Sequence, residues 1–327
     1  MKRIMKRISK RMISKKISKI VLVAGLAAVM LGALTGCMES INYTYNNGDK
    51  YTVGDRTITE KIDTIDIDYL LGDIKLNATE TDAIEIKETS NKTIEDKLKV
   101  HSWVNEGTLY IRFCKSDRGL DFTNLDKNLD ITIPSDTKLS NLKVEISSGS
   151  FSGKELNASS INVNASSGEI DVNCTADKID LTASSGSVNL NQKGDSSEIK
   201  LEVSSGRITA DVENSSIVNV VTSSGDVTFN GKKIKNIETD ASSGDGKYTF
   251  SEVPEKSSFT ASSGEINIYL PEKSDITVES THSSGDFDYE LPFEKNGDNY
   301  VCGSGTNSME INTSSGDQKI MKLKSVE

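Results

Sequence analysis

The sequence predicts an all-β protein whose chain winds into stacked coils, a β-solenoid. Three observations favour this fold: a tripeptide that returns at a nearly constant spacing, an alternation of apolar and polar residues on both sides of it, and too few residues between copies to hold a helix as well as two strands. A fixed period of this kind is typical of chains that stack one supersecondary unit on the next.

The recurring tripeptide is Ser-Ser-Gly, which occurs nine times between residues 147 and 316. The steps between successive copies are 19, 18, 20, 19, 19, 20, 21 and 31 residues. Glycine tolerates the positive φ of a sharp bend and serine is small enough for a crowded corner, so each copy predicts a bend between two strands. The nine glycines are Gly149, Gly168, Gly186, Gly206, Gly225, Gly244, Gly264, Gly285 and Gly316.

The residues beside each tripeptide alternate with a period of two, which indicates strands with one buried and one solvated face. Around the fourth copy, the apolar positions are Ile199, Leu201, Val203, Ile208 and Ala210. One coil cannot cover its own apolar face, so consecutive coils must stack about 4.8 Å apart. A β-sandwich of short strands is the alternative fold, but it gives no reason for one tripeptide to return in register.

The sequence patterns together predict four segments along the chain. Apolar residues flank Gly72 at the same offsets as in the later coils, and the pattern then blurs until about residue 138. Because bare strand edges recruit other chains, this irregular stretch is expected to form wide coils or a hairpin-bearing cap. With about ten stacked coils in all, the expected segments are a lipoprotein signal peptide (1–36), a lipidated N-terminus and linker (37–58), irregular N-terminal coils or cap (59–140) and the regular Ser-Ser-Gly solenoid (141–327).

The first 36 residues have the pattern of a secretion signal. Residues 2–19 hold nine lysines and arginines and no acidic residue, and the apolar run 20–34 is 15 residues long, too short for an ordinary membrane span. The tetrapeptide Leu-Thr-Gly-Cys that ends at Cys37 looks like a bacterial lipobox, which implies cleavage before Cys37 and a lipid on its thiol. The protein is therefore expected to be exported and lipid-anchored to the outer face of the bacterial cell membrane. A signal peptide with an incidental cysteine, or an uncut anchor, is the alternative.

Charge and cysteine content narrow the function further. Without residues 1–36 the chain keeps 29 basic against 49 acidic side chains, a net charge of −20. Such a surface repels nucleic acid, which excludes nucleic-acid binding as a function class. Besides Cys37 there are Cys114, Cys174 and Cys302, an odd number that cannot all pair within one chain. Cys174 continues an inward alternation and is expected to be buried as a small apolar residue.

The strongest candidate site in the sequence is acidic, since an acidic residue follows the corner glycine in most coils. Stacking is expected to place these carboxylates in one outward column, about 5 Å apart. We interpret the column as a solvated ridge; Ca²⁺ sites are the alternative, although a hard cation wants several oxygens from different directions. No metal or other cofactor is expected. The predicted ridge consists of Asp226, Asp245, Glu265, Asp286 and Asp317.

The sequence carries no catalytic or phosphate-binding motif. Its two histidines, His101 and His282, lie in separate parts of the chain, and His282 is expected at a core or corner position. A sugar-cleaving enzyme on a β-solenoid needs basic and aromatic residues that hold the sugar, besides clustered carboxylates. No enzyme is predicted, because the chain without its signal offers little of this equipment: Trp103, Arg56, Arg112, Arg118 and Arg207.

The Ser-Ser-Gly-Asp/Glu-hydrophobic unit, the strand-like segment 129–134 and the closing segment 303–317 resemble the bacterial putative-adhesin domain family of unknown function. The resemblance covers about residues 50–323. It implies a single-stranded, right-handed β-solenoid (β-helix) in an envelope protein without an established catalytic site. Gly246 and Gln318 depart from the repeat, and each predicts a local bulge.

The lipobox-like signal, the repeat and the missing catalytic set together predict a lipid-anchored cell-surface protein. It would act as a non-catalytic, adhesin-like binding or scaffolding platform. Its expected partners are the membrane, through the N-terminal lipid, and an unknown surface polymer or envelope protein. An envelope sensory or regulatory partner of a membrane protein is the alternative, and a carbohydrate-active β-helix enzyme is a weaker one.

Overall fold

The computed structural model describes residues 41–324, so the signal peptide and Cys37 lie outside the described residues. The described chain is all-β and divides into two compact units. The smaller unit consists of residues 41–44 and 117–124, in which β1 (Ile41–Tyr43) pairs antiparallel with β9 (Asp117–Leu120). The larger unit holds one 23-stranded sheet that is wound into a β-solenoid, as the repeat predicts.

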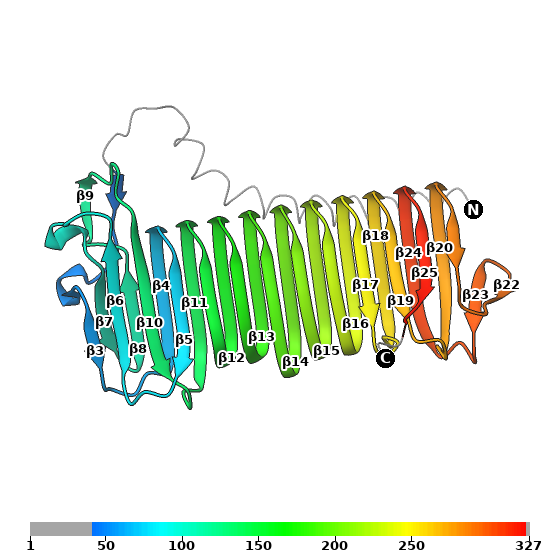
Figure 1. Ribbon diagram of the computed structural model, residues 1–327, viewed down its shortest axis with the longest axis horizontal. Helices are drawn as coiled ribbons and strands as arrows, with labels where there is room; N and C mark the ends of the chain where they lie inside the picture. The colour runs from blue at the N-terminus through cyan, green and yellow to red at the C-terminus, as the bar shows by residue number, and fades with distance from the viewer. Residues whose placement is uncertain (1–40, 325–327) are drawn as a thin grey trace. The chain divides into compact units, whose positions relative to one another are not determined.

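The regular part of the solenoid is a stack of parallel, in-register coils that stand side by side in Figure 1. Most coils are one long strand that runs from one corner glycine to the next and bends on the way. The coils are β11 (Leu139–Ser148), β12 (Phe151–Ser167), β13 (Ile170–Ser185), β14 (Val188–Ser205), β15 (Ile208–Ser224), β16 (Val227–Ser243), β17 (Gly246–Phe250) with β18 (Lys256–Ser263), and β19 (Ile266–Leu270).

The core lies between the two arms of each coil. In β14 the arm after one corner buries Val188 and Leu190, and the arm before the next corner buries Ile199, Leu201 and Val203. The same positions are apolar in the neighbouring coils, so lengthwise rows of Val, Ile and Leu fill the interior. Burial of these rows is what holds coils together that could not cover their apolar faces alone.

The corner requires glycine for two reasons. Gly225 has a φ of 154°, and an added Cβ would lie 1.6 Å from the carbonyl oxygen of Gly206 in the preceding coil. The glycine N–H also bonds between coils, as when Gly206 donates to Ser224 O at 3.1 Å. The tripeptide is therefore specified by the close approach of one corner to the next as well as by the bend itself.

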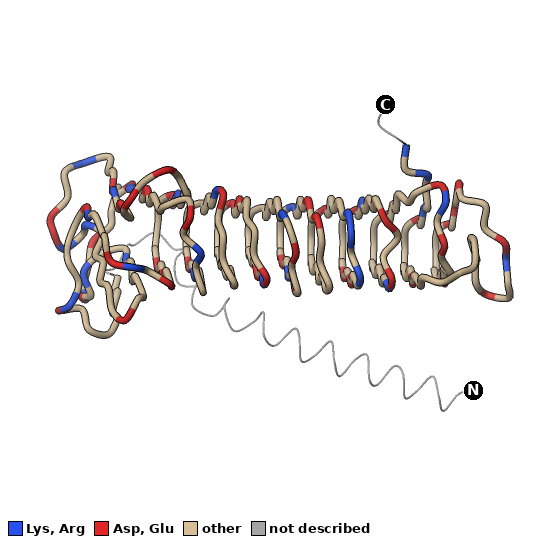
Figure 2. The backbone as a smooth tube through the Cα atoms, turned by 90° about the horizontal axis from the view of Figure 1, so that it is seen from below, with Lys and Arg blue, Asp and Glu red and all other residues tan. Residues whose placement is uncertain are grey.

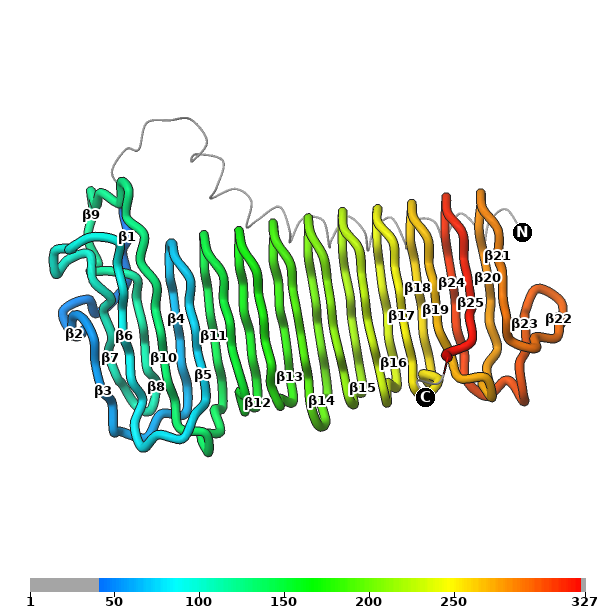
Figure 3. The backbone as a smooth tube through the Cα atoms, in the orientation of Figure 1, coloured from blue at the N-terminus to red at the C-terminus, as the bar shows by residue number. Residues whose placement is uncertain are grey.

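At the N-terminal end, β4 and β5 form the first coil of the solenoid (Figure 3). The chain then adds further strands on the outer side of this coil before it returns to the stack at β11. β4 and β5 pair directly with β11 and β12, although about seventy residues separate the paired strands in the chain. The intervening residues form a cap with antiparallel pairs β7–β8 and β6–β10. The elements of this end are η1 (Gly48–Lys50), β2 (Thr52–Val53), β3 (Arg56–Ile58), β4 (Thr64–Leu71), β5 (Ile74–Thr79), β6 (Ile84–Ser90), η2 (Asp96–Leu98), β7 (His101–Asn105), β8 (Thr108–Arg112) and β10 (Lys127–Pro134).

At the C-terminal end the last coil in the sequence is not the last coil in space. β24 lies between β18 and β20, and β25 lies between β19 and β21, as the red segment in Figure 3 shows. A short hairpin, β22–β23, extends the outermost coil. The elements are β20 (Ile276–Ser284), β21 (Phe287–Tyr289), β22 (Glu294–Asn296), β23 (Asn299–Cys302), β24 (Asn307–Ser315) and β25 (Gln318–Lys322).

The two predicted bulges are wrong, because both residues pair in register with their neighbours. Gly246 stands opposite Val227, and its missing side chain makes room for the ring of Tyr248, whose Cε2 lies 2.5 Å from the place of an added Cβ. Gln318 stands opposite Ile266 and is fully buried. Its amide donates to Thr281 O at 2.9 Å and to Thr313 Oγ1 at 3.0 Å, which satisfies a polar group in the core.

Candidate functional site

The predicted acidic ridge exists as a column along the Ser-Ser-Gly corners, but its order differs from the order in the sequence. Asp317 lies between Glu265 and Asp286, because the coil that carries it is inserted between theirs. All five carboxylates are partly or fully exposed. Acidic positions recur from coil to coil in Figure 2.

Three carboxylates of this column accept hydrogen bonds from backbone N–H groups of the next coil. Asp245 N–H donates to Asp226 Oδ1 at 3.1 Å, and Glu265 N–H donates to Asp245 Oδ1 at 2.9 Å. Asp286 N–H donates to Asp317 Oδ1 at 3.1 Å in the same way. Asp226, Asp245 and Asp317 therefore each accept a hydrogen bond from an N–H group that the corner leaves outside the strand ladder. Sequence reasoning missed this structural role.

Basic side chains partly neutralise the column. Arg207 Nη2 lies 3.8 Å from Asp226 Oδ2, and Lys319 Nζ lies 3.3 Å from Glu265 Oε2 and 3.7 Å from Asp317 Oδ2. Within residues 41–324 no group of three His, Cys, Asp or Glu side chains is placed to hold a metal ion. The column thus supplies backbone caps and surface charge.

A second line of outward side chains crosses the sheet made by the coil arms that precede the corners. We call it the outer row. In-register pairing puts one member on each strand, about 4.8 Å from the next. All members are at least partly exposed. From the cap outward the row consists of Trp103, Tyr110, Asp66, Lys143, Asn162, Asp180, Lys200, Asn219, Glu238, Ser258, Glu310 and Glu279.

The outer row begins in an aromatic cluster, which we define as Tyr45, Tyr51, Trp103 and Tyr110. The rings of Trp103 and Tyr110 stack with centroids 5.6 Å apart and planes inclined by 24°. Tyr51 lies 5.7 Å from Trp103, and Tyr45 lies 4.8 Å from Tyr51. Burial raises the pKa of both Tyr45 and Tyr51, so these hydroxyls stay neutral.

Arg112 joins the aromatic cluster to the polar part of the outer row. Its guanidinium carbon lies 5.4 Å from the centroid of Tyr110, and its Nη1 donates to Asp66 Oδ1 at 2.7 Å and to Asp66 O at 2.9 Å. Asp68, beside Arg112 on the neighbouring strand, has its pKa raised by burial. The side chain of Arg112 is 12% exposed, so this ion pair is shielded from solvent and its geometry is fixed.

Sequence reasoning counted Trp103 and Arg112 among too few aromatic and basic residues to hold a sugar, whereas the fold brings the two together around Tyr110. The sequence feature that could have indicated this is the dipeptide Glu106-Gly107 between two strand-like segments. In the structure it forms a two-residue turn with φ values of 48° and 75°. Such a turn predicts a tight hairpin. That hairpin puts Trp103 directly opposite Tyr110 on one face.

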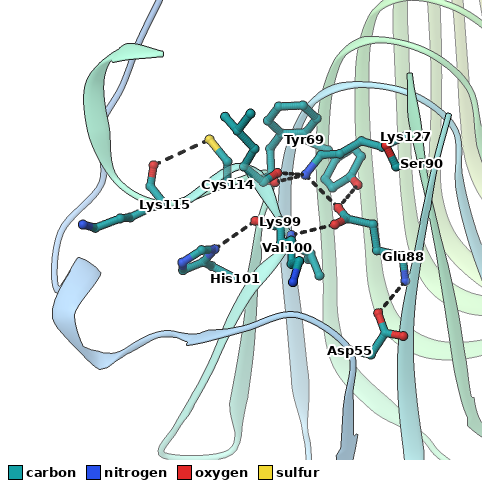
Figure 4. Close-up of polar contacts among 12 residues, drawn as sticks. Asp55, Tyr69, Glu88, Ser90, Lys99, Val100, His101, Cys114, Lys115 and Lys127 are labelled. Carbon is teal, nitrogen blue, oxygen red and sulfur yellow. Dashed lines mark hydrogen bonds and ion pairs between the residues drawn. The ribbon is translucent and has the colours of Figure 1, made fainter. Parts of the chain in front are cut away.

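The cap also encloses a buried ion pair, shown in Figure 4. Lys127 Nζ lies 2.7 Å from Glu88 Oε1, and their side chains are 0% and 5% exposed. The ammonium also donates to Leu98 O at 2.6 Å and to Phe113 O, so its three protons are all bound. Its nitrogen lies 4.0 Å from the centroid of the Phe113 ring.

Glu88 is equally well bound. Its Oε1 accepts from Tyr69 Oη at 3.0 Å, and its Oε2 accepts from Val100 N–H at 3.0 Å. Burial lowers the pKa of Lys127, while Glu88 acts in the opposite direction. With every donor and acceptor satisfied inside the cap, this pair is positioned to hold strands together and not to meet a ligand.

The histidines and cysteines within residues 41–324 do not form a reactive group. His101 is buried in the cap with Nδ1 2.9 Å from Lys99 O, whereas His282 is exposed on the terminal coil. The prediction for Cys174 is confirmed: the residue is buried, and burial raises the pKa of its thiol to about 12. Cys302 is a buried free thiol, and Cys114 is buried as well.

A shallow depression of about 610 Å³ lies at the turns that follow β5 and β10. Its lining is acidic and polar, which gives it no basic or aromatic group to hold a substrate. The lining residues are Glu80, Thr81, Asp82, Pro134, Ser135 and Asp136. Within residues 41–324 no helix is long and apolar enough to span a bilayer.

Comparisons with known proteins agree with this fold. The sequence profile of the family described as Toastrack DUF4097 matches residues 62–321. No curated protein matches the chain. Similar crystal structures include a "putative adhesin" from Parabacteroides merdae, with 14% identity, coverage of 86% of this chain and 99% of that chain, and a TM-score of 0.49.

Two further crystal structures show the same kind of likeness. A "putative lipid binding protein" from Parabacteroides distasonis has 14% identity, covers 83% of this chain and 97% of that chain, and has a TM-score of 0.43. A "putative cell adhesion protein" from Clostridium sporogenes has 11% identity, with coverage of 83% and 100% and a TM-score of 0.27. With TM-scores below 0.5, none of these three likenesses supports a conclusion about this chain.

Proposed function

We propose, for a chain that belongs to the Toastrack DUF4097 family, that the solenoid is a non-catalytic, adhesin-like binding platform on the cell surface. The observation that carries the proposal is the outer row, which presents one side chain on each strand at a fixed spacing. Because the strands are hydrogen-bonded in register on both sides, the row is rigid before any ligand arrives. A preorganised surface loses little conformational entropy on binding.

The chemistry of the outer row supports a polymer as the ligand of this platform. Most of its members carry carboxylate, amide, hydroxyl or ammonium groups, which donate or accept hydrogen bonds in water. The row is long and has a regular period, so a ligand with its own period can repeat the same contact many times. Many weak contacts of this kind add up to strong attachment.

The proposal includes a lipid tether on Cys37 that holds the platform on the outer face of the bacterial membrane. Its support is the basic stretch, the short apolar run and the Leu-Thr-Gly-Cys tetrapeptide. Growth with an alkyne-labelled fatty acid should label the wild-type protein in the membrane fraction. The Cys37→Ser variant should lose the label, and labelling that persists in this variant would exclude the tether.

Sedimentation with insoluble surface polysaccharide tests the binding role. The purified domain should bind the polymer, and the double variant Lys143→Glu/Lys200→Glu on the outer row should bind more weakly. The double variant Lys75→Glu/Lys247→Glu, on the other face of the solenoid, is the matched control because it makes the same charge change. Equal binding by all three would exclude the outer row, and release of reducing ends by the wild type would contradict a non-catalytic role.

A further inference from the structure

We infer that the aromatic cluster and the adjoining outer row form a binding site for an extended, neutral polysaccharide. The inference rests on the proposed binding role and names its ligand class and place. Three features carry it: aromatic rings gathered at one end of the row, polar side chains that continue from them strand by strand, and the negative charge around both.

The aromatic rings supply the apolar part of the site. The ring of Trp103 stacks on that of Tyr110, and both are half-buried on the outward face of the β7–β8 hairpin. The face of an aromatic ring is apolar with partial negative charge, and it suits the slightly positive C–H face of a pyranose ring. Tyr51 packs against Trp103 from another side, which fixes the ring without a ligand.

The polar part of the site begins on the strand next to Tyr110. Tyr110 is paired with Asp66, Asp66 with Lys143, and Lys143 with Asn162, on four neighbouring strands. Each step is about 4.8 Å, which is comparable to the length of one sugar unit in an extended glycan. A sugar chain that crosses the strands therefore meets a new hydrogen-bonding side chain at each unit. Arg112 is occupied by Asp66 and serves to hold that carboxylate in place.

Charge distinguishes a neutral glycan from an acidic one. Asp66 is paired with Tyr110, Asp68 with Arg112, and Glu145 with Asp68 on the next strand. Lys143 and Arg112 are already engaged by carboxylates. The chain as a whole has a net charge of −11 even with its basic N-terminus. Polyanionic polysaccharides are repelled by such a surface, whereas uncharged hydroxyl and acetamido groups are not.

The competing explanation is that the aromatic cluster only fastens residues 45–53 to the cap. Tyr45 Oη donates to Cys114 O at 2.9 Å, which is a contact of this fastening kind. Small apolar clusters under long connections are common in folded proteins. The two explanations differ in whether the face of Trp103 accepts a ligand, and this can be measured directly.

Trp103 is the single tryptophan of the chain, so intrinsic fluorescence reports on this site alone. The purified domain should be titrated with the hexamer of N-acetylglucosamine, with the β-1,4-linked glucose hexamer and with polygalacturonate. A saturable change in Trp103 emission is expected with at least one neutral hexamer and none with polygalacturonate. Tyr110→Ala should weaken binding roughly tenfold, the upper range for loss of one aromatic contact.

Two further variants keep the test decisive if Tyr110→Ala disturbs the cap. Asn162→Ala, three strands from Tyr110, should weaken hexamer binding without touching a ring. Tyr269→Ala removes an aromatic ring that contacts Lys247 on the other face, and it should bind as tightly as wild type. Each variant is compared by urea unfolding, so that loss of folding is not mistaken for loss of binding.

The outcomes separate the site from the platform. If the wild type sediments with polysaccharide but neither neutral hexamer changes Trp103 emission, the site is excluded and the platform stands. If Tyr110→Ala and Asn162→Ala both bind the hexamers as wild type does, the site is likewise excluded. If the wild type binds no polysaccharide in either assay, both the site and the proposed function fail.

Discussion

At the N-terminal end of the solenoid, antiparallel hairpins close over the first coil, whereas at the C-terminal end the hairpin covers only the start of the last coil. β10 pairs with β5 on one side and with β6 on the other, so parallel pairing ends in an antiparallel sheet. β23 pairs with residues 276–279 of β20 only. Within residues 41–324, the rest of β20 and all of β21 pair on one side alone.

The two ends also treat their cores differently. The N-terminal cap keeps an apolar core and closes it around a desolvated ion pair, Lys127 and Glu88. At the C-terminal end the inward positions themselves become polar, with Gln318 bound to Ser280, Thr281 and Thr313. A β-stack can thus end by covering its last apolar surface or by removing it. Either device leaves less apolar edge to pair with another chain.

The largest expected effect is at the covered end. Lys127→Met leaves Glu88 buried without a cation, and breaking a buried pair in this way costs about 3–5 kcal/mol. Urea unfolding should show this loss of unfolding free energy. Amide exchange in the variant should increase most in the strands of the cap. Lys200→Met, which removes an exposed pair with Asp180, is the matched control and should cost less than about 1 kcal/mol. A small effect at Lys127 would mean that hydrophobic packing alone closes the cap.

A corner in the middle of the stack should be nearly as sensitive, and it provides the reference for both ends. Gly225→Ala places a methyl group against the backbone of Gly206 at a φ that disfavours alanine, so the free energy of unfolding should fall by about 3 kcal/mol. Gly297→Ala, in the terminal hairpin, has a φ of 63° but nothing within 4 Å. It should cost about 1 kcal/mol. Equal losses in thermal or urea unfolding would show that φ, and not contact between coils, decides the corner.

The polar core of the C-terminal end should be less costly to disturb. Gln318→Leu leaves Ser280, Thr281 and Thr313 without their partner, at a cost of about 1–2 kcal/mol. Because the change lies at an end, amide exchange should become faster in β20, β21 and β25 and stay unchanged in the cap. An increase in stability would show that the hydrogen bonds of Gln318 are not needed to end the stack.

The smallest effect concerns pH and the cap. Burial lowers the pKa of His101 below its usual 6.5, so the unfolded chain binds a proton more readily than the folded chain. The stability that neutral His101 contributes is full above pH 6.5 and is lost as the pH falls through the lowered pKa. The stability difference between wild type and His101→Gln should therefore shrink between pH 7.5 and pH 5. Parallel pH profiles of unfolding would show that His101 titrates alike in both states.

The regular coils could be predicted because each one repeats the same local rule. The alternation around Gly206 identifies the inward residues, and the corner glycines mark every bend. The order of the coils could not be predicted, since identical corners fit any neighbour and the period does not say which coil lies next. The one sequence feature that indicated an inserted coil was the spacing of 31 residues between Gly285 and Gly316.

The site residues could be predicted only where they follow the repeat. The acidic column does, and its members were found; the aromatic cluster does not, because its rings come from a hairpin and from residues 45–51. Lys127 is in phase with inward-facing Leu129 and Ile131, but an isolated strand gives no reason to bury a lysine. Its partner, Glu88, lies about forty residues earlier in the chain, and only the antiparallel pairing of β6 with β10 brings the two together.

The insertion of residues 307–322 between two earlier coils has a consequence for folding. A chain that emerges N-terminus first during synthesis can stack its coils as far as β18 before the remainder has been made. Until the final residues are in place, β18, which carries Phe259, has an unpaired edge, and β20 has no parallel neighbour. Loss of the last strands by early termination or proteolysis would leave β18 and β20 unpaired in an otherwise folded protein, and their exposed strand edges could pair with other chains.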